Sequence, residues 1–295
     1  MKRKLLLVAI LLISLIFCSC QAKPIADNSC LTVYFFDVGQ ADSSLLIFPD
    51  GLTVLIDAGN DADGEKIAKF LKDGKIKTID YLILTHPHED HIGGASDVID
   101  TVEVKTVCLP YIDKSFYTPT KTYSNLLESI KEENAETVYL SSGKILLEKN
   151  NYCVEALSPS ENSIYSDLND YSVCLKVDYF TNTLLFMGDA EEIAEKEIMA
   201  TGKNLDADIL KVGHHGSSNS SCDEFLKAVS PKIAIISCGK NNSYGHPHSE
   251  TLDRLNKSTN AKIYRTDTVG TVIVKLYDGG FNVETDRYID LNGNN

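Results

Sequence analysis

The chain has 295 residues, enough for one large domain or two small ones, and 43% apolar and 24% charged residues give it an ordinary globular balance. Its formal charge of −14 opposes non-specific binding to polyanions such as nucleic acid, unless a local basic patch intervenes. No repeat and no low-complexity linker divides it, so the sequence favours a single domain.

The first 19 residues predict export. Residues 1–4 are basic, and the apolar run at 5–17 is shorter than the roughly 20 residues that a membrane-spanning helix needs. Cys20 after this run resembles a bacterial lipobox, which implies a lipoprotein signal peptide at 1–19 and a lipid on Cys20 that anchors the protein at the cell surface. An uncleaved membrane anchor is the alternative. Removal of residues 1–19, which carry three basic residues and no acidic one, would lower the charge to −17.

Residues 20–30 are expected to form a tether, and residues 31–290 a single folded domain. Asp57 ends an apolar strand, and one residue, Ala58, separates it from a glycine. It is either a support for metal-ligating histidines or an ordinary turn residue. Strands are predicted at 31–38, 45–48 and 53–59, and an amphipathic helix at 65–72. The second and third strands would form a hairpin.

The segment 85–91, Thr-His-Pro-His-Glu-Asp-His, follows an apolar run of strand length. Its three imidazoles and one carboxylate are the nitrogen and oxygen ligands that zinc prefers. On an extended segment His86 and His88 would point to the same side, while Asp90 and His91 would face a neighbouring point. Such a set suits two metal ions about 3.5–4 Å apart. A histidine-rich surface loop is the weaker alternative, because three of the seven histidines fall in this heptad.

Between 102 and 159, strands are predicted at 107–109, 137–140, 145–147 and 153–157, and a helix at 122–135. The segment 111–122 contains three aromatic residues and Pro119. It would form either the rim of a substrate cleft or a surface loop, and we favour the loop.

Polar residues follow two later strands. Asp189 comes after an apolar strand and Gly188, and is the candidate carboxylate to bridge two ions; the alternative is an N-cap for the helix at 191–200. His214 and His215 follow the strand at 209–213, and we expect His214 to matter more for metal because strand alternation would turn His215 to the other side. The remaining histidines, His246 and His248, lie just before a helix at 249–256.

The His-x-His-x-Asp-His motif resembles the signature of the metallo-β-lactamase superfamily at every position. Together with the segments at 36–42, 169–172, 188–189, 214–217, 244–248 and 264–270, it makes the chain similar to the ComEC-type branch, the soluble domain of the bacterial DNA-uptake channel and its free-standing relatives. The resemblance covers about residues 31–285. It implies an α/β fold, the four-layer αβ/βα sandwich, with metal ions at one edge of two packed sheets. Asn169 and Asp170 stand where most members carry a histidine, which implies weaker or oxygen-rich ligation of one ion.

The resemblance also implies the roles of the site residues. Two divalent ions are expected, zinc first and manganese as the alternative. The expected ligands are His86, His88, Asp90, His91, Asp189 and His214. The expected catalytic groups, which would orient a metal-bridging hydroxide or stabilise the leaving oxygen, are Asp90, His215 and His248; His246 and His248 are alternatively further ligands.

The implied function is an exported metal-dependent hydrolase, a phosphodiesterase or nuclease. Its expected partners are a phosphodiester substrate, DNA included, and the membrane through Cys20; no protein partner can be inferred. Within the enzyme class the alternatives are a phosphoester hydrolase acting on cell-wall or lipid headgroups, and a lactonase or β-lactamase. A metal-bearing surface protein without catalysis is the alternative from another class.

Overall fold

The computed structural model describes residues 27–112, 118–289 and 291. The predicted signal peptide at 1–19, the lipid anchor at Cys20 and most of the predicted tether lie outside these residues. Within the described ranges, no helix combines the length and the apolar character that crossing a bilayer requires.

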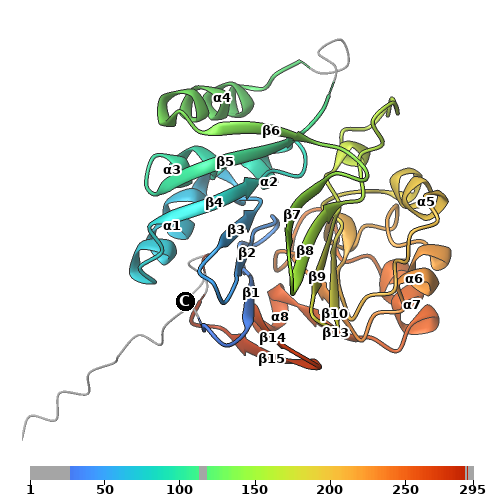
Figure 1. Cartoon of the computed structure of the whole chain (residues 1–295). Coiled ribbons are helices and arrows are strands. Elements are labelled where there is room, and N and C mark those ends of the chain that lie inside the picture. Colours follow the sequence, from blue (N-terminus) through green and yellow to red (C-terminus); the bar gives the residue numbers. More distant parts are fainter. Residues whose placement is uncertain (1–26, 113–117, 290, 292–295) are drawn as a thin grey trace, which may run out of the picture.

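Two β-sheets form the centre of the molecule (Figure 1). The eight-stranded sheet has the order β15-β14-β1-β2-β3-β4-β5-β6 and contains β1 (Leu31–Phe35), β2 (Ser44–Ile47), β3 (Thr53–Ile56), β4 (Thr78–Ile83), β5 (Glu103–Pro110), β6 (Glu136–Leu140), β14 (Thr271–Tyr277) and β15 (Gly280–Asp286). The seven-stranded sheet has the order β13-β12-β11-β10-β9-β8-β7 and contains β7 (Ile145–Lys149), β8 (Tyr152–Ala156), β9 (Leu175–Tyr179), β10 (Asn182–Phe186), β11 (Ile209–Lys211), β12 (Ile233–Ile236) and β13 (Lys262–Arg265).

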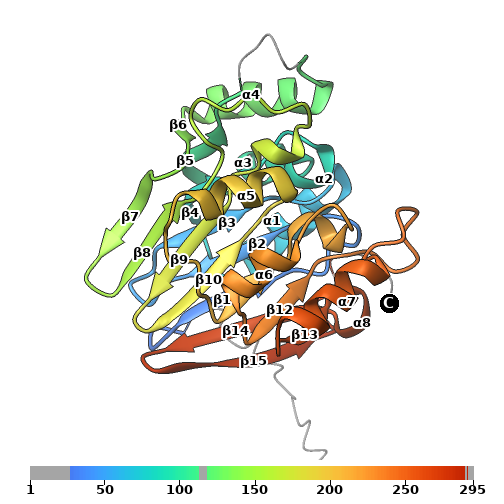
Figure 2. The ribbon, with the colours of Figure 1, turned by 90° about the vertical axis from the view of Figure 1, so that its right-hand side faces the viewer.

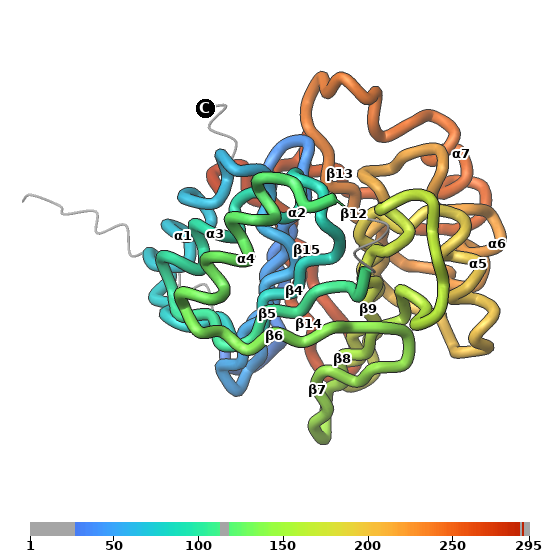
Figure 3. Tube along the Cα trace, turned by 90° about the horizontal axis from the view of Figure 1, so that it is seen from above, coloured from blue at the N-terminus to red at the C-terminus, as the bar shows by residue number. Residues whose placement is uncertain are grey.

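Helices cover the outer face of each sheet (Figures 2 and 3). Those against the eight-stranded sheet are α1 (Gly64–Asp73), α2 (Glu89–Ile92), α3 (Ala95–Ile99) and α4 (Lys121–Glu133). Those against the seven-stranded sheet are α5 (Glu192–Ala200), α6 (Asp223–Val229) and α7 (Ser249–Ser258). The short elements are η1 (Asp61–Asp63), η2 (Asn169–Tyr171), η3 (Gly213–Gly216) and α8 (Thr266–Val269). The predicted four-layer αβ/βα sandwich is confirmed.

Alternating side chains build the layers. In β1, Val33 and Phe35 pack between the two sheets, whereas Tyr34 packs against the helices on the outer face. This is the period of two expected of a strand that is buried on both faces. Phe35 stacks on Phe186 of the other sheet, with ring centroids 5.6 Å apart. Each such fully buried side chain contributes about 1.5–3 kcal/mol to stability.

Parallel pairing brings several loops to one edge of the two sheets. Strands β3, β4, β5 and β6 run parallel in one sheet, and β10, β11, β12 and β13 run parallel in the other. Loops that leave the carboxyl ends of parallel strands lie together and form ligand sites. The predicted histidine and aspartate motifs follow β4, β10, β11 and β12, so the fold brings them to this edge.

Glu195 of α5 ties this helix to the loop that follows η3. Its carboxylate is fully buried and accepts hydrogen bonds from the backbone amides of Ser221 and Cys222. Burial nevertheless raises the pKa of Glu195 from 4.5 to about 7, outweighing those hydrogen bonds. Below about pH 7 the folded protein therefore holds this side chain mainly in its protonated form.

This preference predicts a pH-dependent stability. Between about pH 4.5 and 7 the folded protein binds more protons at Glu195 than the unfolded chain does, so this group's contribution to stability falls as the pH rises. Over this pH range the wild type should lose about 3 kcal/mol of its free energy of unfolding through this group, at 1.36 kcal/mol per pKa unit. We expect Glu195→Gln not to show this loss. Urea unfolding at pH 5 and pH 8 measures the difference between the variant and the wild type. Equal pH dependence in the two proteins would contradict this assignment.

Candidate metal centre

The loop after β4 presents three imidazoles and one carboxylate. His88 lies on extended backbone, and His86 Nε2 is 2.9 Å from His88 Nδ1, so the two rings meet on the same side as expected. Asp90 and His91 lie in the single turn of α2 that follows. This turn carries the chain from the first pair of groups to the second.

Asp189 lies among four imidazoles. Its Oδ1 is 3.2 Å from His91 Nε2. Its Oδ2 is 3.9 Å from His86 Nε2, 3.7 Å from His214 Nε2 and 3.6 Å from His215 Nε2. A carboxylate with both oxygens among separate nitrogen donors has the arrangement that a bridging ligand requires. The alternative N-cap interpretation is wrong, because the N-cap of α5 is Glu191.

Gly188 allows Asp189 to reach this position. It has a φ of 52°, and an added Cβ would lie only 3.0 Å from the Cβ atoms of Thr85 and Ser172. Ser172 Oγ accepts a hydrogen bond from the Asp189 backbone amide at 3.0 Å and lies 3.4 Å from His86 Nδ1. The strand end that carries Asp189 is therefore packed closely against the loop that carries His86.

The strand-alternation argument for His214 and His215 is wrong. β11 ends at Lys211, and the two histidines lie in η3 with left-handed φ angles of 48° and 51°. Both rings consequently approach Asp189. His215 is buried, with its Nε2 3.3 Å from Asp90 Oδ2, whereas the His214 side chain keeps 21% of its surface exposed.

Hydrogen bonds to the other ring nitrogen orient these imidazoles. His215 Nδ1 donates to the carbonyl oxygen of Ser237 at 3.0 Å, which leaves its Nε2 lone pair for a metal. His91 Nδ1 lies 2.7 Å from Asp57 Oδ2, and Thr85 donates to both oxygens of the same carboxylate at 2.8 Å. The contacts of Asp57 therefore support its interpretation as the partner that holds a ligating histidine.

Sequence reasoning missed Asp42 and Lys211. Asp42 forms with His91, Asp189 and His215 a buried group whose ligand atoms all lie within 4.8 Å of one another. Lys211 Nζ contacts both oxygens of Asp42, at 2.7 and 2.8 Å. The segment 36–42 had contributed to the resemblance, but nothing local to it indicates a partner that lies 169 residues away.

The side chains fit a cation. His91 Nε2, Asp189 Oδ1 and His215 Nε2 are buried and make no hydrogen bond of regular geometry, although His91 Nε2 lies 3.2 Å from Asp189 Oδ1 and His215 Nε2 lies 3.3 Å from Asp90 Oδ2. Buried polar atoms are normally satisfied, so three unsatisfied atoms within one cluster point to an ion. Their charges agree with this. Burial lowers the pKa of His91, but the carboxylates of Asp189 and Asp57 outweigh it and raise the pKa well above its ordinary value. Positive charge is thus favoured at this point.

The likeness of the chain to known proteins shows its family. The model of the Metallo-beta-lactamase superfamily matches residues 37–240. The chain belongs to the metallo-β-lactamase superfamily. It is 35% identical over 257 residues to ComE operon protein 3 of Bacillus subtilis, which covers 81% of this chain and 32% of that protein. It is 29% identical over 270 residues to competence protein ComA of Neisseria gonorrhoeae, covering 91% of this chain and 35% of that protein.

These relatives confirm the resemblance to the ComEC-type branch, although the chain spans only about a third of their length. A metallo hydrolase of Ignicoccus hospitalis, Igni18, shares the superfamily fold with a TM-score of 0.54 at 14% identity, over 86% of this chain and 99% of that one. The superfamily, the fold and the buried cluster agree with the predicted metal-dependent hydrolase.

The superfamily site opens into a cleft of about 560 Å³. Its lining includes the predicted ligands or catalytic groups His88, Asp90, Asp189, His214 and His215. His86 and His91 lie buried beneath it.

Two further predictions are tested by the cleft lining. Asn169 lines the cleft, while Asp170 turns away to accept hydrogen bonds from the backbone amides of Glu191 and Ala194. His248 is not brought to the cleft, because its Nδ1 accepts from the Ser218 backbone amide at 2.9 Å and its Nε2 lies 3.1 Å from the Tyr244 carbonyl oxygen.

His246 takes the place at the cleft that was expected of His248. It is buried, lines the cleft, and lies with its ring stacked on that of Tyr244 at 5.6 Å. Burial, reinforced by the neighbouring His214 and His215, lowers the pKa of His246 to about 4. The ring is therefore neutral near pH 7.

This geometry reverses the expected ranking of the histidine pair. We now expect His215→Ala to weaken metal binding more than His214→Ala, because His215 is buried, oriented by Ser237 and close to two carboxylates. The affinity for metal should fall by at least about 10- to 100-fold, because removing only the residue that hydrogen-bonds to a metal ligand already causes a loss of that size. Metal content after dialysis against a buffered zinc series measures both variants. Greater loss in His214→Ala would contradict the assignment.

Proposed function

We propose that this chain is a metal-dependent phosphodiesterase. The observation that carries the proposal is the place of Asp189, whose two oxygens lie among imidazoles that come from both sheets. The groups that would hold two ions both approach this carboxylate: His86 with His88, and Asp90 with His91 and His215. His214 and His215 both approach the same Asp189 oxygen as His86, but His215 also lies 3.3 Å from Asp90. His214 would therefore complete the first group and His215 the second.

Two ions, when bound, would supply an activated water near neutral pH and neutralise the charge of a phosphodiester. Zinc is the first candidate because the donors are mainly imidazoles, and manganese the second because carboxylates and Asn169 add oxygen donors. The protein would contribute orientation. Asp57 and the Ser237 carbonyl fix the rings of His91 and His215, so that their Nε2 atoms face the cluster.

His246 would act on the substrate rather than on an ion. The Gly239 backbone amide donates to Gln40 Oε1 at 3.0 Å, which leaves Gln40 Nε2 to donate to His246 Nδ1 at 3.2 Å. The proton of this neutral ring therefore sits on Nε2. That N–H is the donor that His246 offers, and it would bind a phosphoryl oxygen in the cleft.

Cleavage of DNA is the second candidate, favoured by the competence-protein relative. The charges argue for weak binding. None of the described residues that line the cleft is Lys or Arg. Of the basic residues nearest the motifs in sequence, Lys211 is buried against Asp42 and Arg265 is paired with Asp267. Binding to a polyanion would be weak and steeply salt-dependent.

One assay separates the candidates. The metal-loaded protein is tested side by side on bis-nitrophenyl phosphate, nitrophenyl phosphate, a lactone, a β-lactam and single-stranded DNA. We expect hydrolysis of the diester, and slow DNA cleavage at low salt alone. Turnover of the lactone or β-lactam alone would overturn the proposal, and ions bound without turnover of any substrate would favour a non-catalytic metal site. Export and the lipid anchor at Cys20 stay predictions.

A further inference from the structure

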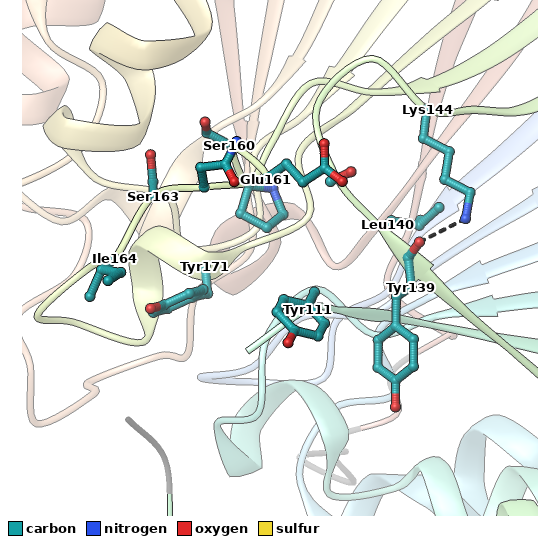
Figure 4. A pocket seen from close by; sticks show the side chains of 12 residues that line it. Tyr111, Tyr139, Leu140, Lys144, Ser160, Glu161, Ser163, Ile164 and Tyr171 are labelled. Carbon is teal, nitrogen blue, oxygen red and sulfur yellow. Dashed lines mark hydrogen bonds between the residues drawn. The ribbon is translucent and has the colours of Figure 1, made fainter. Parts of the chain in front are cut away.

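A second hollow, of about 620 Å³, shares the turn η2 with the metal cleft. One wall comes from the end of the eight-stranded sheet, through Tyr111 and Tyr139, and the other from the loop that carries Ser160, Glu161 and Ser163 (Figure 4). The turn η2 belongs to both hollows: Asn169 lines the metal cleft, and Tyr171 lines the second one. A substrate held at the ions could therefore extend past η2 into this space.

Aromatic rings dominate the chemistry of this hollow. Tyr111 and Tyr139 are 58% and 51% exposed, and their rings meet edge to face with centroids 6.1 Å apart. Tyr171 is buried, and its ring packs against Tyr165 at 4.8 Å. Exposed aromatic rings beside a buried one make a surface on which a flat ring can stack.

The charges of the hollow give it no net attraction for a phosphate. Among the described lining residues Lys144 is the basic one, and its Nζ donates to the carbonyl oxygen of Tyr139 at 2.8 Å. Glu161 faces the same space with a negative charge. Anionic groups are thus left to the ions in the cleft, while the hollow offers serine hydroxyls, an amide and aromatic faces to a neutral ring.

Backbone and side-chain hydrogen bonds hold the walls in place. The Ser142 amide donates to the Pro159 carbonyl oxygen at 2.8 Å, which joins the β6–β7 turn to the loop opposite. Ser163 Oγ donates to Glu197 of α5 at 2.8 Å. The hollow is therefore formed by structure that is already ordered, as ligand sites usually are.

From these observations we infer that the hollow is a binding subsite for a planar aromatic ring of the substrate, of the size of a nucleobase, next to the phosphodiester that the ions hold. The inference rests on the proposed phosphodiesterase function and names its substrate class. Tyr111 and Tyr139 are its specificity-determining residues. They touch the ring and not the reacting phosphate.

The test compares two substrates that differ only in their rings. These are thymidylyl-thymidine and its analogue in which both bases are absent, with products separated by chromatography. We expect Tyr111→Ala/Tyr139→Ala to raise KM for the dinucleotide by about 5-fold or more, the lower end of what stacking one base contributes. The value of kcat, and both constants for the analogue, should change little. Tyr111→Phe/Tyr139→Phe should behave as the wild type, since the rings are kept.

Tyr288→Ala is the matched control, because Tyr288 is 94% exposed and lines neither hollow. Equal losses on the two substrates, or no loss on either, would overturn the subsite. If the wild type cleaves neither substrate, the proposed function has failed for nucleotides and the subsite is tested by binding. Saturation-transfer NMR should then show contact with the thymine protons that the double alanine variant loses. Its absence, or transfer to the chain of octyl phosphate instead, would overturn the inference.

Discussion

Replacing Asp189 by Asn is expected to abolish metal binding and hydrolysis together. Burial alone would raise the pKa of Asp189, but His91 and His215 outweigh it and hold that pKa well below its ordinary value, so the group is a carboxylate whenever the protein is folded. The amide carries no charge and offers one oxygen where the carboxylate offers two. Both groups of histidines would lose the negative charge that they share.

The expected loss is large. Metal ions supply several kcal/mol of charge stabilisation in such reactions, and each 1.36 kcal/mol is a factor of ten in rate, so hydrolysis should fall by at least about 100-fold. Elemental analysis of the purified protein and an assay on bis-nitrophenyl phosphate measure the two effects. Asp170→Asn is the control, because its side chain is also buried but contacts the backbone of α5 outside the cleft. A full metal content in Asp189→Asn would refute the bridging role.

Replacing Lys211 by Met should lower the free energy of unfolding of the metal-free protein more than any of the other substitutions proposed for this chain. The Lys211 side chain is 3% exposed, and its ammonium group contacts both oxygens of Asp42. Removing one partner of a buried ion pair leaves an uncompensated charge and costs about 3–5 kcal/mol. Here that charge would lie in the same cluster as a second carboxylate, Asp189.

Two variants make this expectation specific. Lys105→Met removes a surface ion pair with Asp80, in which Lys105 is 55% exposed, and should change the free energy of unfolding little. Lys211→Met/Asp42→Asn removes both charges and should recover part of the loss. Urea unfolding in the presence of a chelator measures all three variants. If Lys211→Met is no more destabilising than Lys105→Met, the buried pair does not stabilise the fold.

The sequence predicted the parts of this molecule that depend on local pattern. Alternating apolar residues marked most of the strands, the motif at 85–91 located the first group of candidate ligands, and the position of Asp189 after a strand and a glycine located the carboxylate among them. Each of these signals lies within a few residues. The arrangement of two packed sheets between helical layers came from the family resemblance.

The errors concern properties that no local pattern encodes. Strand periodicity cannot show that His214 and His215 leave β11 with left-handed backbone angles, so it assigned them to opposite sides. The proline between His246 and His248 gave no sign of which ring would enter the cleft. The pairing of Asp42 with Lys211 depends on the packing of one sheet against the other, and appears only in three dimensions.

The supply of candidate ligands from both sheets links metal binding to the assembly of the fold. His86, His88, Asp90 and His91 follow β4 of the eight-stranded sheet, whereas Asp189 and His215 follow β10 and β11 of the other. The loops of one sheet alone do not carry a complete set of ligands, so the ions would bind only when the two sheets are packed together. By mass action, such binding raises the free energy of unfolding by about 4 kcal/mol when the free metal concentration is 1,000 times its dissociation constant. The availability of metal would then set the lifetime of this protein as well as its activity.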